Sequence, residues 1–183
     1  MLEGIKLGAN DIVLLEASAS ELLVMDGNLP LKTLYARYNR LAKAHNKGAV
    51  THFTGFVRQE GAMSKTDGLV FELYEPLLVQ WFAAHKERLE GMGVFVCMAH
   101  SRGFVPVGKS SFSVCLIAKQ RASVLGELAN FVEDFKQNAP IWKYDLIAGE
   151  RLFERKRAKP LHGSGLFGDN APSPKPHDES AEG

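Results

Sequence analysis

The chain has 183 residues, 45% of them hydrophobic, and its 22 basic and 21 acidic side chains leave a formal net charge of +1. This length and composition predict one globular domain with a core, and the balanced charge argues against nucleic acid or an anionic membrane as a partner. No apolar run approaches the roughly 18 residues that span a bilayer. The N-terminal stretch "MLEGIKLGAND" lacks the basic and apolar regions of a signal peptide. We therefore expect a cytoplasmic protein in which any anion site is local.

The first half of the chain mixes strand and helix patterns. Alternating or continuous apolar residues rich in Val, Thr and Phe predict strands. A helix is predicted where Pro30 precedes apolar residues at helical spacing and Gly48 follows them. The predicted elements are strands over 11–17 and 21–27, a helix over 30–48, a strand over 48–58 and an exposed loop over 58–68.

The second half continues in the same way. A helix is predicted from Pro76 to the glycines at 91 and 93, and another ends before Pro140. The predicted elements are a strand over 69–76, a helix over 76–91, strands over 93–100 and 110–119, a helix over 121–138 and a hairpin over 144–153. The connections between paired strands are too short for parallel crossovers. The fold class is therefore α+β, with a mostly antiparallel sheet covered by helices.

From Pro160 onward the composition changes. This segment holds half of the protein's eight prolines and has no periodic apolar pattern after Phe167. Such a composition cannot bury enough apolar surface to offset its ordering entropy. We expect a single domain over residues 1–159 and a disordered tail over 160–183.

The two cysteines, Cys97 and Cys115, lie within the apolar runs "VFVCMA" and "FSVCLIA". Neither has the spacing of a metal ligand or of a redox pair, so we expect buried strand residues in a reducing compartment. No metal site and no resident cofactor are predicted.

Basic side chains gather at the predicted ends of helices and strands, where a rigid scaffold presents functional groups. Each has an ordinary explanation as well. A lysine at a helix C-terminus is stabilised by the helix dipole by about 0.3–1 kcal/mol whatever its function. A lysine after Trp142 can lay its stem on the ring and keep its ammonium in water. Spacing alone therefore leaves both solvated charges and a local anion site open for Arg58, His100, Arg102, Arg121, Lys136 and Lys143.

Four stretches of the chain carry a family resemblance: "GAVTHFTGFVR", "LYEP", "AHSRGFVPVG" and "FKQNAPIWKYD". Together they resemble the large, catalytic subunit of molybdopterin synthase, the MoaE family, in the family's order over Lys47 to Phe153. The first and last blocks are fairly specific to it.

The resemblance implies a sulfurtransferase. The family converts cyclic pyranopterin monophosphate into molybdopterin, a cofactor precursor, by inserting two sulfurs that form a dithiolene. The sulfur arrives as a thiocarboxylate on the C-terminal Gly-Gly tail of a small ubiquitin-like partner. The family enzyme is a heterotetramer built around a homodimer of large subunits.

The resemblance also implies the site. Lys143 and Lys136 match its two essential lysines, and the turn at Pro140 is expected to bring them to one pocket. Preplaced cations stabilise the negative charge that develops during sulfur transfer, and a lysine with a lowered pKa can move protons. The expected substrate-binding residues are Phe56, Val57, Arg58, Gln120, Arg121, Tyr144 and Asp145, with His100 and Arg102 as further candidates.

The chain departs from the family at three of these places. Gln120 stands where the family has a histidine that can titrate, and Asp145 stands for a glutamate. The family's His-Arg-x-Gly becomes His100-Ser101-Arg102-Gly103, and a shift of one place on a strand reverses the face unless a bulge intervenes. A working enzyme is our main interpretation, and a non-catalytic homologue that docks a ubiquitin-like protein is the alternative. A nucleic-acid-binding module is disfavoured because no aromatic and basic stripe is present.

Overall fold

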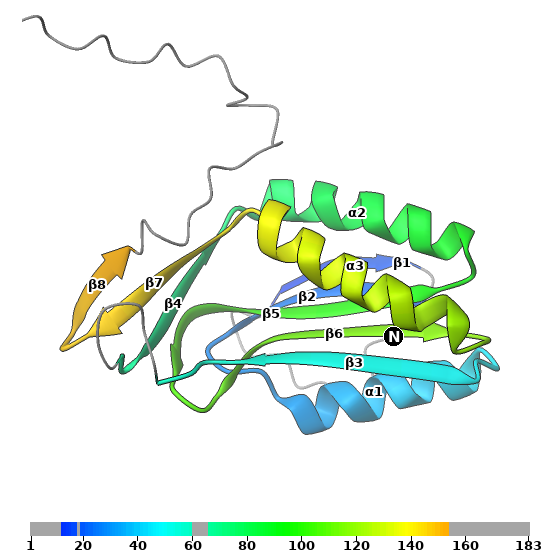
Figure 1. The fold of residues 1–183 in the computed structure, drawn as a ribbon, viewed down its shortest axis with the longest axis horizontal. Helices are drawn as coiled ribbons and strands as arrows, with labels where there is room; N and C mark the ends of the chain where they lie inside the picture. The colour runs from blue at the N-terminus through cyan, green and yellow to red at the C-terminus, as the bar shows by residue number, and fades with distance from the viewer. Residues whose placement is uncertain (1–11, 18, 60–65, 154–183) are drawn as a thin grey trace, which may run out of the picture.

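The computed structural model describes residues 12–17, 19–59 and 66–153. Over these residues the chain forms one eight-stranded sheet with three helices. Helices α2 and α3 lie on one face of the sheet and α1 on the other (Figure 1). The elements are β1 (Ile12–Ala17), β2 (Ser20–Asp26), α1 (Leu31–Ala44), β3 (Ala49–Phe56), β4 (Gly68–Leu73), α2 (Glu75–Gly91), β5 (Phe95–Pro106), β6 (Ser110–Ala118), α3 (Ala122–Asn138), β7 (Ile141–Ile147) and β8 (Glu150–Phe153).

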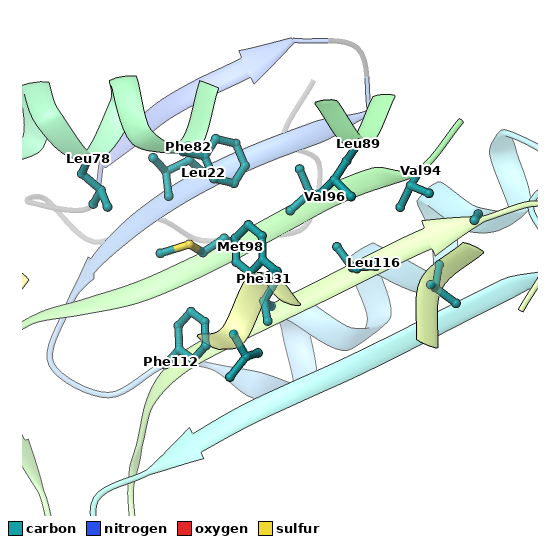
Figure 2. Packing of buried hydrophobic residues seen from close by; sticks show 14 of the residues in the cluster. Leu22, Leu78, Phe82, Leu89, Val94, Val96, Met98, Phe112, Leu116 and Phe131 are labelled. Carbon is teal, nitrogen blue, oxygen red and sulfur yellow. The ribbon is translucent and has the colours of Figure 1, made fainter. Parts of the chain in front are cut away.

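Two hydrophobic cores lie on opposite faces of the central strands because successive side chains of a strand point to opposite sides. Leu22 and Val24 of β2 face α2 and α3, where they meet Phe82 and Phe131 (Figure 2). The alternate residues of the same strand, Leu23 and Met25, face α1. Both faces are therefore covered, and β2 and β6 are buried along nearly their whole length.

The predicted class is confirmed, with one addition. Six of the seven strand pairs of the described chain are antiparallel, and β2 pairs with β5 in parallel. The predicted closing hairpin is also confirmed. Ala148 and Gly149 both have positive φ, +50° and +84°, as a tight two-residue turn between β7 and β8 requires.

Strand β5 is longer than the sequence predicts, because the residues that follow His100 have the pattern of a connection. The first part of β5 pairs with β6 and β2, and its last residues, Gly103 to Pro106, pair with β4. Gly103 has φ of +74°, a conformation open to glycine, at the point where the strand changes partners. Strand β5 thus joins the central strands to the outer group β4, β7 and β8 (Figure 1).

Helix α1 is shorter than predicted, ending at Ala44 rather than near Gly48. Asn46 adopts positive φ, and the amides of Asn46 and Lys47 bond back to the carbonyls of Lys43 and Ala42. This is the Schellman arrangement, in which asparagine can replace the usual glycine.

Two other expectations concern the chain as a whole. Cys97 and Cys115 are free and buried, as predicted, and lie opposite each other on β5 and β6. In the described part of the chain, no helix is both long and apolar enough to cross a membrane. The expected tail, 160–183, falls outside the described residues.

Candidate active site

Lys136 lies in the last turn of α3, where the helix dipole favours a cation. Its Nζ is 2.9 Å from Oε1 of Glu133, one turn earlier on the same helix. Both side chains are more than half exposed, at 57% and 62%. An ion pair in water is weak and easily exchanged, so Lys136 remains available to a bound anion.

Lys143 follows the turn that ends α3. The amide of Ala139 bonds to the carbonyl of Phe135, and the carbonyl of Pro140 accepts a hydrogen bond from the amide of Tyr74. The chain then enters β7, where Lys143 pairs with Phe71 of β4. Lys143 is half-buried, whereas its position directly after a turn predicts an exposed side chain.

Four ring side chains from four elements form one aromatic cluster. Phe112 of β6 and Phe135 of α3 stack with centroids 4.1 Å apart at an interplanar angle of 7°. The ring of His100 lies 5.6 Å from Phe135 and 5.1 Å from Phe71. We call Phe71, His100, Phe112 and Phe135 the aromatic cluster.

Each lysine neighbours one member of this cluster, Lys136 along the chain and Lys143 across the sheet. Lys136 directly follows Phe135 in α3, and Lys143 is the cross-strand neighbour of Phe71 on the same face of the sheet. The rigid turn through Pro140 therefore returns the chain to the same aromatic surface that it left at the end of the helix.

His100 is held neutral at this site. Its ring is 3% exposed, and Nδ1 lies 2.7 Å from the carbonyl oxygen of Ser101. A carbonyl only accepts, so Nδ1 carries the proton of the neutral ring. Burial lowers the pKa of His100 to about 4, although the hydrogen bond to Ser101 opposes the shift. His100 thus supplies shape and a fixed tautomer at neutral pH, and no positive charge.

Arg58 lies two residues after the end of β3 and directly follows Val57, which packs on Phe71. The preceding residue, Val57, is buried in a small core with Phe71 and Val105. Its backbone is fixed on both sides, by the carbonyl of Lys109 and the amide of Gly108. Arg58 itself is exposed directly after this anchored residue, and Phe56 on the other side is 55% exposed. An exposed guanidinium next to an anchored backbone can bind an anion.

Gln120 and Arg121 are not near the lysines within one chain. Both are exposed at the N-terminal end of α3, with Arg121 at the N-cap. Fifteen residues separate Arg121 from Lys136 at the other end, which is roughly 22 Å along a helix axis. The expectation of one shared pocket for the two lysines stays a prediction, and within a single chain Gln120 and Arg121 lie at the other end of α3.

The remaining candidates have other surroundings. The guanidinium of Arg102 contacts carboxylate oxygens of Asp26 and Glu75, each at 2.8 Å, and so ties β2 to the start of α2. Tyr144 points to the face of β7 opposite Lys143, where its ring lies 5.5 Å from that of Phe153. Burial and, after it, the nearby Glu72 raise the pKa of Tyr144.

Asp145 lies on the same face of β7 as Lys143, two residues further along the strand, and is half-buried.

The residues missed by sequence reasoning are the phenylalanines of the aromatic cluster. Their patterns were those of ordinary core positions, and no local signal showed that four elements bring them together. No group of three or more potential ligands among the described residues could hold a metal ion.

Comparison with known proteins points to one family. The family described as MoaE protein matches residues 29–138. The molybdopterin synthase catalytic subunit of Helicobacter pylori strain 26695 is 43% identical over 146 residues, which cover 80% of this chain and 99% of that protein. The molybdopterin synthase catalytic subunit of Bacillus subtilis is 29% identical over 101 residues, covering 54% of this chain and 64% of the relative.

Solved structures are similar to the chain as well. The complex of subunits 1 and 2 of the molybdopterin-converting factor from Helicobacter pylori 26695 contains a chain that matches with a TM-score of 0.75 at 43% identity, covering 80% of this chain and 98% of that one. Molybdopterin synthase from Staphylococcus aureus matches with a TM-score of 0.63 at 19% identity, over 76% of this chain and 98% of that chain, and supports the fold.

Proposed function

The chain belongs to the MoaE protein family, and we propose that it is the catalytic subunit of a molybdopterin synthase, a sulfurtransferase. Its substrate is cyclic pyranopterin monophosphate, and two inserted sulfurs produce the dithiolene of molybdopterin. The single observation that supports the residue assignment is that Lys136 follows Phe135 at the end of α3 and Lys143 pairs with Phe71 from β7, so that each lysine neighbours a member of the aromatic cluster.

The chemistry suits two cations beside an aromatic surface. The cyclic phosphate is anionic, and attack by a thiocarboxylate produces tetrahedral states with further negative charge. Fixed positive groups stabilise such charge most where water is partly excluded. Lys143, which is half-buried in β7, acts as acid or base and stabilises charge. Lys136, which is exposed, contributes mainly charge.

The phosphate and pterin are held by the neighbouring residues. Arg58 binds the phosphate as the exposed guanidinium next to the anchored Val57. Phe56 offers an exposed ring, and Asp145 shares the face of β7 that carries Lys143. Tyr144 borders the site from the other face. His100 supports the aromatic cluster as a neutral ring, and Arg102 has a structural role because two carboxylates bind it.

Gln120 and Arg121 join a site from a second copy of the chain. Their separation from Lys136 along α3 excludes a shared contact with one small substrate within one protomer. A homodimer in which the start of one α3 approaches the end of the other would bring them to the lysines. Gln120 then hydrogen-bonds the substrate and does not titrate.

The sulfur donor is a small ubiquitin-like carrier that ends in Gly-Gly and forms a heterotetramer with the dimer. The similar structure from Helicobacter pylori is a complex of two subunits, which supports such a partner. The cysteines of this chain do not supply the sulfur, because both are buried and burial raises the pKa of each thiol. Free cysteines also favour a cytoplasmic location.

We place a functional boundary between Lys159 and Pro160, outside the described residues. The domain covers residues 1–159, and the segment 151–159 carries five basic residues against one glutamate. Truncation after Lys159 should preserve dimerisation and sulfur transfer, whereas truncation after Leu152 should weaken partner or substrate binding. Loss of transfer on removing residues 160–183 alone would show that the tail is part of the site.

The direct test combines the purified chain, its precursor substrate and the thiocarboxylated carrier, with dithiolene formation as the readout. We expect turnover by the wild-type chain and a large loss in Lys143→Ala. A chain that binds the carrier tightly but gives no dithiolene would instead be the non-catalytic docking homologue.

A further inference from the structure

We propose that Asp134 is a positioning residue for the two lysines: it fastens the last turn of α3 to α2 and so fixes where Lys136 and Lys143 stand. The inference rests on the proposed function for its catalytic consequence, but its geometric part can be tested without it.

The carboxylate of Asp134 accepts three hydrogen bonds. Trp81 donates through Nε1 at 2.8 Å and His85 lies at 2.8 Å through Nε2, both from α2. Asn138 donates through Nδ2 at 2.7 Å from the last residue of α3 itself. All three are well within hydrogen-bond distance, and bonds to a charged acceptor are stronger than neutral ones. Asp134 is thus held from two helices at once.

Helical spacing explains how these four residues meet. Trp81 and His85 are four apart on α2, and Asp134 and Asn138 are four apart on α3, so each pair shares one helix face. The two helices lie along the same side of the sheet (Figure 1). The contact falls at the end of α3, because Asn138 is its last residue and the Pro140 turn follows.

A continuous series of contacts leads from Asp134 to the aromatic cluster that neighbours the lysines. The ring of Trp81 lies 5.8 Å from Phe135, which stacks on Phe112 in the aromatic cluster. Lys136 is the residue after Phe135. The turn beyond Asn138 is tied to α2 as well, since the carbonyl of Pro140 accepts the amide of Tyr74. The segment that carries both lysines is therefore attached to α2 before and after the turn.

The surroundings of Asp134 keep its carboxylate charged. Burial would raise the pKa of Asp134, but the hydrogen bonds from Trp81, Asn138 and His85 outweigh it and lower the pKa, so the carboxylate stays charged. Among the described residues, Nδ1 of His85 is buried without a hydrogen-bond partner. An unsatisfied buried nitrogen costs stability and calls for a reason. Holding the end of α3 in one place is such a reason.

A second link between the same helices provides a matched control. Arg88 of α2 and Glu127 of α3 form an ion pair at 2.7 Å, two turns of α3 away from Asp134. Glu127→Ala removes a link of similar kind between α2 and α3 at a distance from the lysines. Asp134→Ala removes the link next to the lysines. Asp134→Asn keeps the size of the side chain and one of its two acceptor oxygens.

The first measurement needs no substrate. In the full chain with isotope-labelled methyl groups on its lysines, the NMR signals of Lys136 and Lys143 are assigned by Lys→Arg variants. In Asp134→Ala we expect both signals to move, with the signals of Lys32 and Lys43 on α1 unchanged, and Glu127→Ala should leave all four in place. Unmoved Lys136 and Lys143 signals in Asp134→Ala would overturn the proposal.

The second measurement is sulfur transfer in the assembled complex. We expect Asp134→Ala to lower kcat about tenfold with little change in KM, as for other residues that orient a catalytic group. Asp134→Asn should lie between it and wild type, and Glu127→Ala should keep wild-type kcat. If Asp134→Ala and Glu127→Ala lower kcat equally, the loss reflects weaker packing between α2 and α3 in general. That result would refute a positioning role for Asp134. An inactive wild-type complex would count against the proposed function alone, because the NMR result stands independently.

Discussion

At the scale of single residues, Lys143 and Lys136 differ in their surroundings, and their variants should differ too. Lys143 is half-buried beside Phe71, whereas Lys136 is exposed and paired with Glu133. Lys143→Ala should remove most sulfur transfer but change the free energy of unfolding by only about 0.5 kcal/mol, as is usual away from fully buried sites. Lys136→Ala should lose less activity.

Single-turnover assays and urea unfolding measure the two effects side by side. Wild-type turnover in Lys143→Ala would contradict the assignment. Parallel losses of stability and activity would instead indicate that Lys143 only supports the fold.

His100 should make the stability of the protein depend on pH. Its pKa is about 4 in the folded protein, against about 6.5 in an unfolded chain. Because the folded pKa is the lower one, the unfolded chain takes up the proton first as the pH falls. The stabilisation is complete above about pH 6.5 and is lost progressively toward pH 4, by on the order of 3 kcal/mol.

Urea unfolding at several pH values between 7 and 4 checks this expectation. His100→Gln, which keeps a donor for the carbonyl of Ser101, should show a flatter dependence on pH. Some slope will remain, because burial also lowers the pKa of His52. An unchanged slope in His100→Gln would mean that His100 is not the group that titrates.

At the scale of helices and strands, local patterns predicted most of the fold. The three helices follow from apolar residues at helical spacing, and the hairpin of β7 and β8 follows from its Ala148-Gly149 turn. The extension of β5 beyond His100 could not be predicted, because it depends on pairing with β2 and β4, which are distant in the sequence. The aromatic cluster was missed for the same physical reason.

For the candidate site, too, the sequence indicates some features and leaves others out. The resemblance points to Lys136, Lys143 and Arg58, and their roles stay predictions. The partners of Arg102 could not be foreseen, since Asp26 and Glu75 come from a strand and a helix far from it along the chain. Local sequence indicates which residues are present at the end of an element, but it does not indicate which charges other elements bring to them.

Gly68 offers a test of the joint between β4 and β5. A Cβ atom at this position would lie 2.4 Å from the carbonyl oxygen of Val105, a backbone atom that cannot move away freely. Gly68→Ala should therefore destabilise the protein by about 2 kcal/mol or more, in the range of forced overpacking. Gly126→Ala is the matched control, because nothing lies within 4 Å of its Cβ position. This helical site should gain about 0.5–1 kcal/mol, and chemical unfolding of the two variants would be compared.

At the scale of the whole molecule, the positions of Arg121 and Lys143 determine how many chains make one site. The two residues lie near opposite ends of α3, so a site that uses both must combine two protomers. In a mixed dimer of one Lys143→Ala chain and one Arg121→Ala chain, one site then carries both defects and the other carries none. If each site were built within one chain, both sites of the mixed dimer would carry one defect.

We therefore expect each pure variant dimer to be nearly inactive and the mixed dimer, purified through two different tags, to regain about half of the wild-type kcat. The measurement is dithiolene formation with saturating carrier, since each intact site should turn over at its normal rate. A mixed dimer as inactive as its parents would mean that one chain supplies both Arg121 and Lys143 to each site, and it would overturn the two-protomer arrangement. An Arg121→Ala dimer with wild-type turnover would instead remove Arg121 from the catalytic assignment and leave Arg58 as the phosphate anchor.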